Sequence, residues 1–239
     1  MQNIHSLLHL GNLSKFSLLS VCHQLTHLKR FILIILSCAL CFSNANAQVP
    51  IGRSNSVTLF DHYNPAVIEF ADGHCSNQSQ ANIFLKNSSL LYKSGINDME
   101  AKMVNIKSVV IDRRRFINVK NQLAEVIDTC GGDMLLKIVL IDMEAFQKEC
   151  LNNSNITNIE IGESLGVTRL DADPSVLKYP LCATYYYMLD SKIVRCHERD
   201  VQRAIGKARQ RDYKVCVARQ FDWSKERDLS ELLKVLNKK

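Results

Sequence analysis

Cys75 has the strongest case for chemistry of any residue in this chain. It follows Gly73 and His74 after the apolar run "PAVIEF", and a helix could begin at Ser79. A thiol becomes a reactive thiolate when a helix N-terminus or a nearby cation stabilises its negative charge. Cys75 is therefore a candidate catalytic residue. The competing interpretation, which we favour, is that Cys75 is one half of a structural disulfide bond.

The cysteine count supports the disulfide interpretation. Nine cysteines occur in the chain, and six remain when the first 47 residues are set aside as a leader. An even number of cysteines in an exported chain indicates a set of structural disulfides, although the sequence does not select the pairing. The candidates for structural disulfides are Cys75, Cys130, Cys150, Cys182, Cys196 and Cys216. No C-x-x-C pair occurs among them, so we expect no metal site.

Residues 1–47 have the pattern of a secretory signal peptide. Lys29 and Arg30 precede the apolar run "FILIILSCALCF", and Ala45 and Ala47 then form an A-x-A cleavage pattern. The run is shorter than the roughly 20 apolar residues that a membrane-spanning helix needs. We therefore expect an exported protein, periplasmic or secreted, with no membrane span after cleavage. A lipobox-like match at Cys38 and a start downstream of Met1 are weaker alternatives.

The remaining residues, 48–239, predict a single disulfide-containing domain in which strands and helices alternate. Strands are expected at 67–70, 134–141 and 213–219, with a hairpin around Asp190 and Ser191. Apolar residues at helical spacing between 97 and 130 predict helices that end at Gly131 and Gly132. Further helices are expected after 142, around 201–208 and after Ser224. The fold class that follows is α/β or α+β.

Basic residues recur along the predicted helix around 201–208. Arg199, Arg203, Lys207 and Arg211 step by four, which would form a strip for phosphate, acidic lipid or nucleic acid, or only a solvated helix face. The leader removes three basic residues and no acidic one, so 27 basic side chains face 24 acidic ones in residues 48–239. This near balance favours the solvated face, and we expect no nucleic-acid partner. Nucleotide-binding, serine-hydrolase and zincin motifs do not occur in the sequence, so we expect no cofactor.

Two separated pieces of the chain resemble the thioredoxin-like family. "PAVIEFADGHC" is similar to the strand and turn that lead to the family's attacking cysteine, and "YPLCATYYYMLDSKIV" is similar to its cis-proline and hairpin. The resemblance implies that Cys75 is the attacking cysteine and Pro180 the cis-proline. It also implies a thioredoxin-like sheet flanked by helices, with a helical insertion at about 79–130 and an additional C-terminal strand and helix.

One departure from the family bears directly on activity. Its second active cysteine would fall at Gln78, so no resolving thiol is present to release a mixed disulfide formed by Cys75. We therefore expect a non-enzymatic envelope or secretion-assembly protein, an adaptor on a degenerate thioredoxin-like core, whose partners are other exported or envelope proteins. The alternative is a thiol-disulfide oxidoreductase or isomerase that uses Cys75 near Pro180, and the sequence leaves the question of enzymatic activity open.

Overall fold

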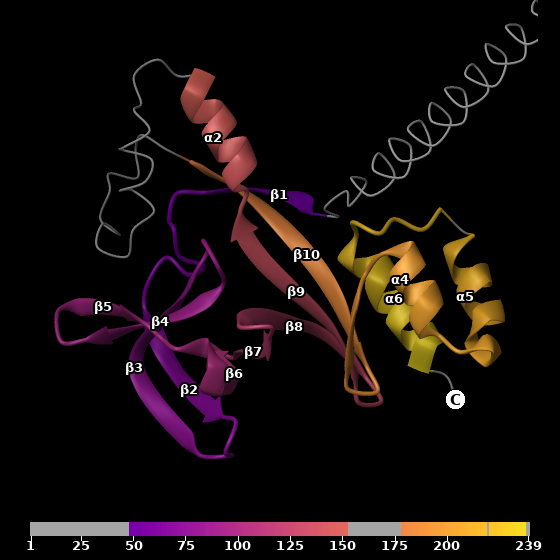
Figure 1. Ribbon diagram of the computed structural model, residues 1–239, viewed down its shortest axis with the longest axis horizontal. Helices are drawn as coiled ribbons and strands as arrows, with labels where there is room; N and C mark the ends of the chain where they lie inside the picture. Colours follow the sequence, from indigo (N-terminus) through magenta and orange to yellow (C-terminus); the bar gives the residue numbers. More distant parts are fainter. Residues whose placement is uncertain (1–47, 153–177, 219, 238–239) are drawn as a thin grey trace, which may run out of the picture. The chain divides into compact units, whose positions relative to one another are not determined.

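One large antiparallel sheet dominates the computed structural model, which describes residues 48–152, 178–218 and 220–237 (Figure 1). Neighbouring strands follow the order β1-β10-β9-β8-β7-β6-β2-β3-β4-β5, and β11 pairs with β10. The strands are β1 (Val49–Ser54), β2 (Asn64–Phe70), β3 (Cys75–Phe84), β4 (Ser89–Ser94), β5 (Asn97–Glu100), β6 (Ile106–Ile111), β7 (Arg114–Val119), β8 (Gln122–Cys130), β9 (Asp133–Ile141), β10 (Tyr179–Leu189) and β11 (Lys192–Arg195).

Helices are fewer than strands in the described residues. The α-helices are α2 (Met143–Asn152), α4 (Glu198–Ala204), α5 (Gln210–Val217) and α6 (Glu226–Asn237), and short 3-10 helices occupy η1 (Met103–Asn105) and η3 (Lys207–Arg209). Helices α4, α5 and α6 gather beside β10 and β11 (Figure 1).

Tight turns join the strands from β6 to β9, and β10 to β11, into hairpins. Two-residue turns with positive φ at both positions join β6 to β7, β7 to β8, β8 to β9 and β10 to β11. Their central residues are Asp112 and Arg113, Lys120 and Asn121, Gly131 and Gly132, and Asp190 and Ser191. Such turns have the twist of a β-hairpin, and they fix the register of the strands on either side.

The first half of the sheet curls around its own core. Leu123 N donates to the Ser88 carbonyl and Ile141 N donates to the Leu85 carbonyl, each at 2.8 Å, so the turn between β3 and β4 lies against β8 and β9. The side chains inside this curl are apolar and buried: Ala66, Ile68, Ala81, Ile83, Leu90, Met103, Ile106, Val109, Ile111, Phe116 and Leu123.

A second core lies between one face of β8, β9 and β10 and the C-terminal helices. Leu229, Leu232, Leu233 and Leu236 of α6 are all fully buried there, against strand residues that include Leu135 and Tyr187. We call this side of β8–β10 the inner face. The predicted leucine stripe of the last helix is confirmed.

The thioredoxin-like fold expected from the sequence is wrong. The sheet is wholly antiparallel, and residues 79–130, expected as a helical insertion, form β3 to β8 apart from the turns and η1. Cys75 begins a strand rather than preceding a helix, and Pro180 lies within β10 without a cis peptide bond. The expected strand at 213–219 is helical over 213–217, in α5.

The error over 97–130 has a physical cause. Apolar residues at spacings of three and four also occur in short strands that are joined by two-residue turns. Within each strand the apolar residues alternate, and each turn shifts the position at which the alternation begins again. The stretch "IKSVVI" of β6 is rich in β-branched residues, which favour strands. Asp112 and Arg113 form a turn without glycine, so the usual sequence signal for a hairpin is missing.

Candidate interaction surface

The surroundings of Cys75 do not match those of a reactive thiol. Cys75 is exposed at the start of β3 and lies opposite Glu69 of β2, a carboxylate that also accepts hydrogen bonds from Lys107 and Ser108. The ring of His74 stacks on Phe70, with ring centroids 4.2 Å apart. No described helix begins at Cys75 or Ser79, so the helix N-terminus that was expected to stabilise a thiolate is absent from the described residues.

Cys75 and Pro180 do not share a site. Five strands, β9, β8, β7, β6 and β2, separate β10 from β3 in the sheet order. Pro180 pairs with Arg53 of β1, whose guanidinium forms an ion pair with Glu149 of α2. The arrangement on which an oxidoreductase would depend is therefore not formed.

The other described cysteines lie in two regions. Cys130, Cys196 and Cys216 belong to the inner-face core, whereas Cys182 is buried in β10. Burial and the nearby charge of Asp142 raise the pKa of the Cys182 thiol to about 11, and burial raises the pKa of Cys196 well above its ordinary value. Raised pKa values keep both thiols protonated, which makes them poor nucleophiles.

The predicted disulfide framework remains a prediction. No disulfide joins any two of Cys75, Cys130, Cys182, Cys196 and Cys216 in the described residues, and the side chain of Cys150 lies outside them.

Two hollows lie beside the C-terminal helices. One of about 520 Å³ lies between α5 and α6 and is lined by Asp212, Asp228 and Glu231 among others. The other, about 430 Å³, lies where β1 and β10 meet α4 and includes Cys196 and His197. Within the described ranges, no group of His, Cys, Asp and Glu is arranged to hold a metal ion. The protonated Cys196 does not supply a nucleophile to the second hollow.

A more informative feature is the face of β8–β10 opposite to α6. The apolar side chains gathered on this outer face, which we call the outer patch, are Ile117, Val119, Ala124, Val126, Met134, Leu136, Ile138, Leu140, Tyr186 and Met188. The register aligns them across the strands, since Val126 lies opposite Leu136, and Leu136 opposite Tyr186. Cross-strand neighbours in an antiparallel sheet point to the same face, so these side chains form one continuous surface.

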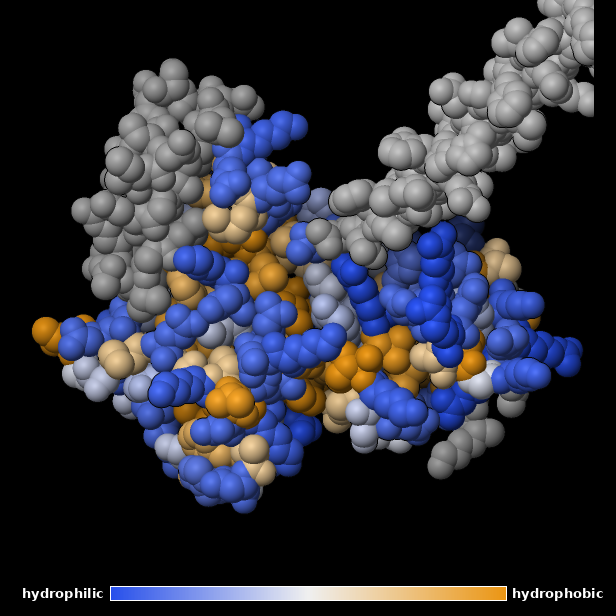
Figure 2. Space-filling view, viewed as in Figure 1, coloured by the Kyte–Doolittle hydropathy of each residue, from blue (hydrophilic) through white to orange (hydrophobic). Residues whose placement is uncertain are grey.

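The outer patch is covered only in part. Val119, Ala124, Leu136 and Ile138 are buried, and the other six members are partly exposed. Every member comes from a strand, so no described helix packs on this cluster. Figure 2 shows hydrophobic residues at the surface over the region of β8 to β10. A contiguous apolar surface of this kind typically marks a binding site.

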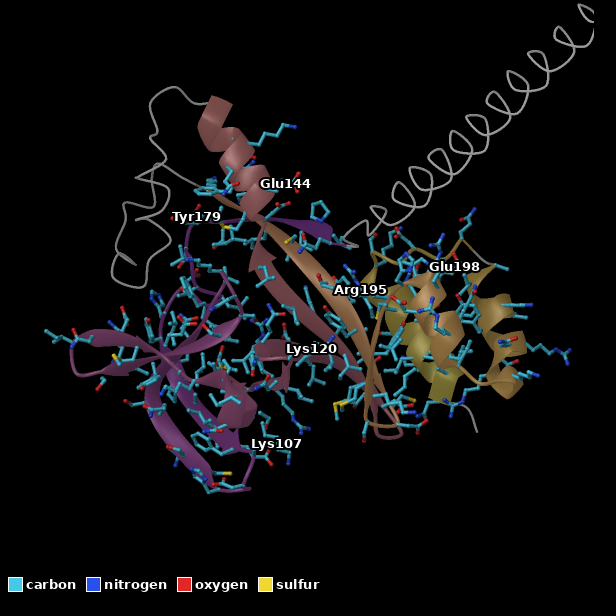
Figure 3. The ribbon with its side chains drawn as sticks, in the orientation of Figure 1. Lys107, Lys120, Glu144, Tyr179, Arg195 and Glu198 are labelled. Atoms are coloured by element: carbon cyan, nitrogen blue, oxygen red, sulfur yellow. The ribbon has the colours of Figure 1, made fainter. Side chains whose placement is uncertain are left out.

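Arginines lie at both ends of the cross-strand row that Val126, Leu136 and Tyr186 form in the outer patch. Arg195 of β11 lies opposite Tyr186. Arg115 of β7 lies opposite Val126, because the next residue of β7, Phe116, pairs with the preceding residue of β8, Glu125. Figure 3 labels Arg195 beside β10. Among the described residues, neither arginine forms an ion pair, and the Nε of Arg195 is buried without a hydrogen-bond acceptor.

The outer patch was missed by the sequence prediction because it exists only through pairing. The run at 134–141 was predicted as a strand buried on both faces, and that apolar character on both sides was the available signal. Which residues join it depends on the register of β7 to β10, and the turns at 112–113 and 120–121 fall within the stretch that was predicted as helices.

Comparison with known proteins gives no family assignment. No protein family, curated protein or solved structure matches this chain. The described helices include none with the length and apolar character required to cross a membrane.

Proposed function

We propose that this chain is an exported, disulfide-stabilised and non-enzymatic adaptor or assembly protein of the cell envelope, which binds another exported protein through the outer patch. Export rests on the leader at 1–47. Binding rests on one observation: an antiparallel sheet covered by its own helices on one face has an apolar and partly exposed opposite face. A face that only met solvent would be polar.

An oxidoreductase activity has less support than binding. The chain lacks a second cysteine three residues after Cys75, and Cys75 lies at a strand start beside Glu69. A thiol that attacked a substrate disulfide would be left in a mixed disulfide with no local partner to release it. An adaptor role needs no such step.

Photo-crosslinking in the source cells tests the proposed function. A photoreactive phenylalanine analogue replaces Tyr186 in the outer patch or, as a matched control, Tyr92 of β4, which is also a partly exposed tyrosine on a strand. We expect a discrete crosslinked protein from position 186 in the envelope or secreted fraction and none from position 92. Equal products at both positions, or none at 186, would contradict the proposal.

A further inference from the structure

The inner face shows how a single helix packs across β8 and β9 of this sheet. Helix α6 lies over β8 and β9 with four fully buried leucines, and the Tyr187 hydroxyl donates to the Leu229 carbonyl at 2.8 Å. A charged contact borders this apolar seam, since Lys137 Nζ lies 2.6 Å from Glu226 Oε1. One helix with an apolar stripe and a charged flank therefore satisfies the inner face.

The outer face has the same layout without a helix. Val126, Leu136 and Tyr186 form the apolar centre of the row, on β8, β9 and β10, and Arg115 and Arg195 end the row on β7 and β11. Four strand spacings separate the backbones of the two arginines by about 19 Å. A helix with its side chains is about 10–12 Å wide, so a helix placed on the centre has a guanidinium within side-chain reach on each side.

The charges on this face lack a counterpart. Arg115 and Arg195 have no ion-pair partner among the described residues. The neighbouring Arg114, by contrast, donates two hydrogen bonds to the carboxylate of Glu125. The charge of Arg115 helps to lower the pKa of Glu69, after the larger effects of Lys107 and Ser108, but the ion pair of Glu69 is with Lys107. The Nε of Arg195 is buried without a hydrogen-bond acceptor, which costs free energy. A carboxylate is the acceptor that a guanidinium binds most strongly.

We infer that the partner presents an amphipathic helix whose apolar stripe is bordered by acidic residues on both sides. This inference rests on the proposed function and specifies its ligand. The apolar stripe covers the partly exposed Val126 and Tyr186, between which Leu136 is buried, and the carboxylates meet Arg115 and Arg195. The partner helix takes the place on the outer face that α6 takes on the inner face.

Two designed peptides of about 18 residues test the inference with residues 48–239 as the binding protein. Both carry the same leucine stripe, bordered by glutamates in one peptide and by lysines in the other. Fluorescence anisotropy should show binding of the glutamate peptide and at least about tenfold weaker binding of the lysine peptide. Equal affinity for the two peptides, or preference for the lysine peptide, would overturn the inference.

Charge reversal of the protein provides the second arm. The double variant Arg115→Glu/Arg195→Glu should lose about tenfold in affinity for the glutamate peptide and gain affinity for the lysine peptide. Arg113→Glu, in the adjacent turn, is the control and should change neither affinity. Circular dichroism checks the fold of each variant, and Arg115→Gln/Arg195→Gln serves if the double reversal unfolds. A rescue by the lysine peptide cannot arise from misfolding.

The failure of this inference is distinguishable from the failure of the proposed function. A crosslink from position 186 with no binding of either peptide means that an adaptor surface exists but does not take such a helix, which overturns the inference alone. Loss of the crosslink as well overturns both. Sedimentation that shows a dimer abolished by Tyr186→Arg would mean that a second copy covers the patch, which also overturns the inference.

Discussion

The two faces of β8–β10 differ in what covers them rather than in what they are made of. On the inner face, α6 buries its leucines against Leu135 and Tyr187, and these side chains are inaccessible to solvent. On the outer face, Tyr186 and Met188 come from the same strand as Tyr187 but remain partly exposed. One strand thus supplies both a folding core and an open surface, because its side chains alternate between the faces.

This difference separates stability from function. The stabilisation from apolar burial grows with the area removed from water, so the more completely buried side chains of the inner face contribute more to the stability of this part of the chain. The partly exposed outer face contributes less to folding and is available for binding. Substitutions on the two faces should therefore have opposite profiles, with large effects on unfolding on one side and on binding on the other.

The largest expected effect is on the inner face. Leu233→Ala removes a fully buried side chain from α6 and leaves a cavity, which should lower the free energy of unfolding by about 3 kcal/mol. Met188→Ala, on the outer face, should lower it by about 1 kcal/mol or less, since Met188 is only partly buried. Urea unfolding of both variants measures the difference. Similar losses at the two positions would mean that the outer face is a core in its own right.

A smaller effect is expected where α6 ends against the turn between β8 and β9. Gly131 has φ +55°, and a Cβ there would lie 2.2 Å from the Oδ1 of Asn237, whose Nδ2 donates to Asp133 at 2.9 Å. Gly131→Ala should destabilise the chain by about 2 kcal/mol, from backbone strain and the displaced Asn237. Gly95→Ala has a similar φ of +65° with no atom near its Cβ, so only the strain of about 1 kcal/mol applies. Thermal unfolding compares the two, and equal losses would show that the contact with Asn237 does not matter.

The last helix and the strands between 97 and 141 show what could and could not be predicted from the sequence. The last helix and the strand at 134–141 were predicted because each has a long and regular apolar pattern, and the hairpin at Asp190 and Ser191 was predicted for its aromatic and β-branched flanks. The strands between 97 and 130 were not, since their turns lack glycine except at the last. The residues of the outer patch are brought together by the register of those strands, so the patch could not be predicted without predicting the strands.

A pH effect tests the charged border of the inner face. Burial acts to raise the pKa of Glu226, but the hydrogen bond and charge of Lys137 and the Tyr185 hydroxyl outweigh it, so the pKa is lowered on folding. A lowered pKa stabilises the fold above the unfolded value of about 4.3, and this contribution is lost as the pH falls through the folded pKa.

Glu226→Gln should therefore reduce stability at pH 7 but hardly at pH 3. Because the pair is partly exposed, the difference should stay below about 1 kcal/mol. Urea unfolding at the two pH values measures it. A loss that is the same at both would mean that the Glu226 charge is not what borders the seam.

The smallest effect on stability is expected at the margin of the outer face, where the effect on binding should be large. Ile193 of β11 lies opposite Met188, and Ile51 of β1 is another edge-strand isoleucine with the same exposed fraction, 37%. Ile193→Lys and Ile51→Lys should each change the free energy of unfolding by less than about 0.5 kcal/mol, as is usual for exposed positions. Only Ile193→Lys should weaken the crosslink from position 186, because it places a charge beside the outer patch. If both variants kept the crosslink, the contact surface would end before β11, and Arg195 would lie outside it. If both lost it, the surface would extend over β1 as well, and the contrast between the two faces would no longer explain where the partner binds.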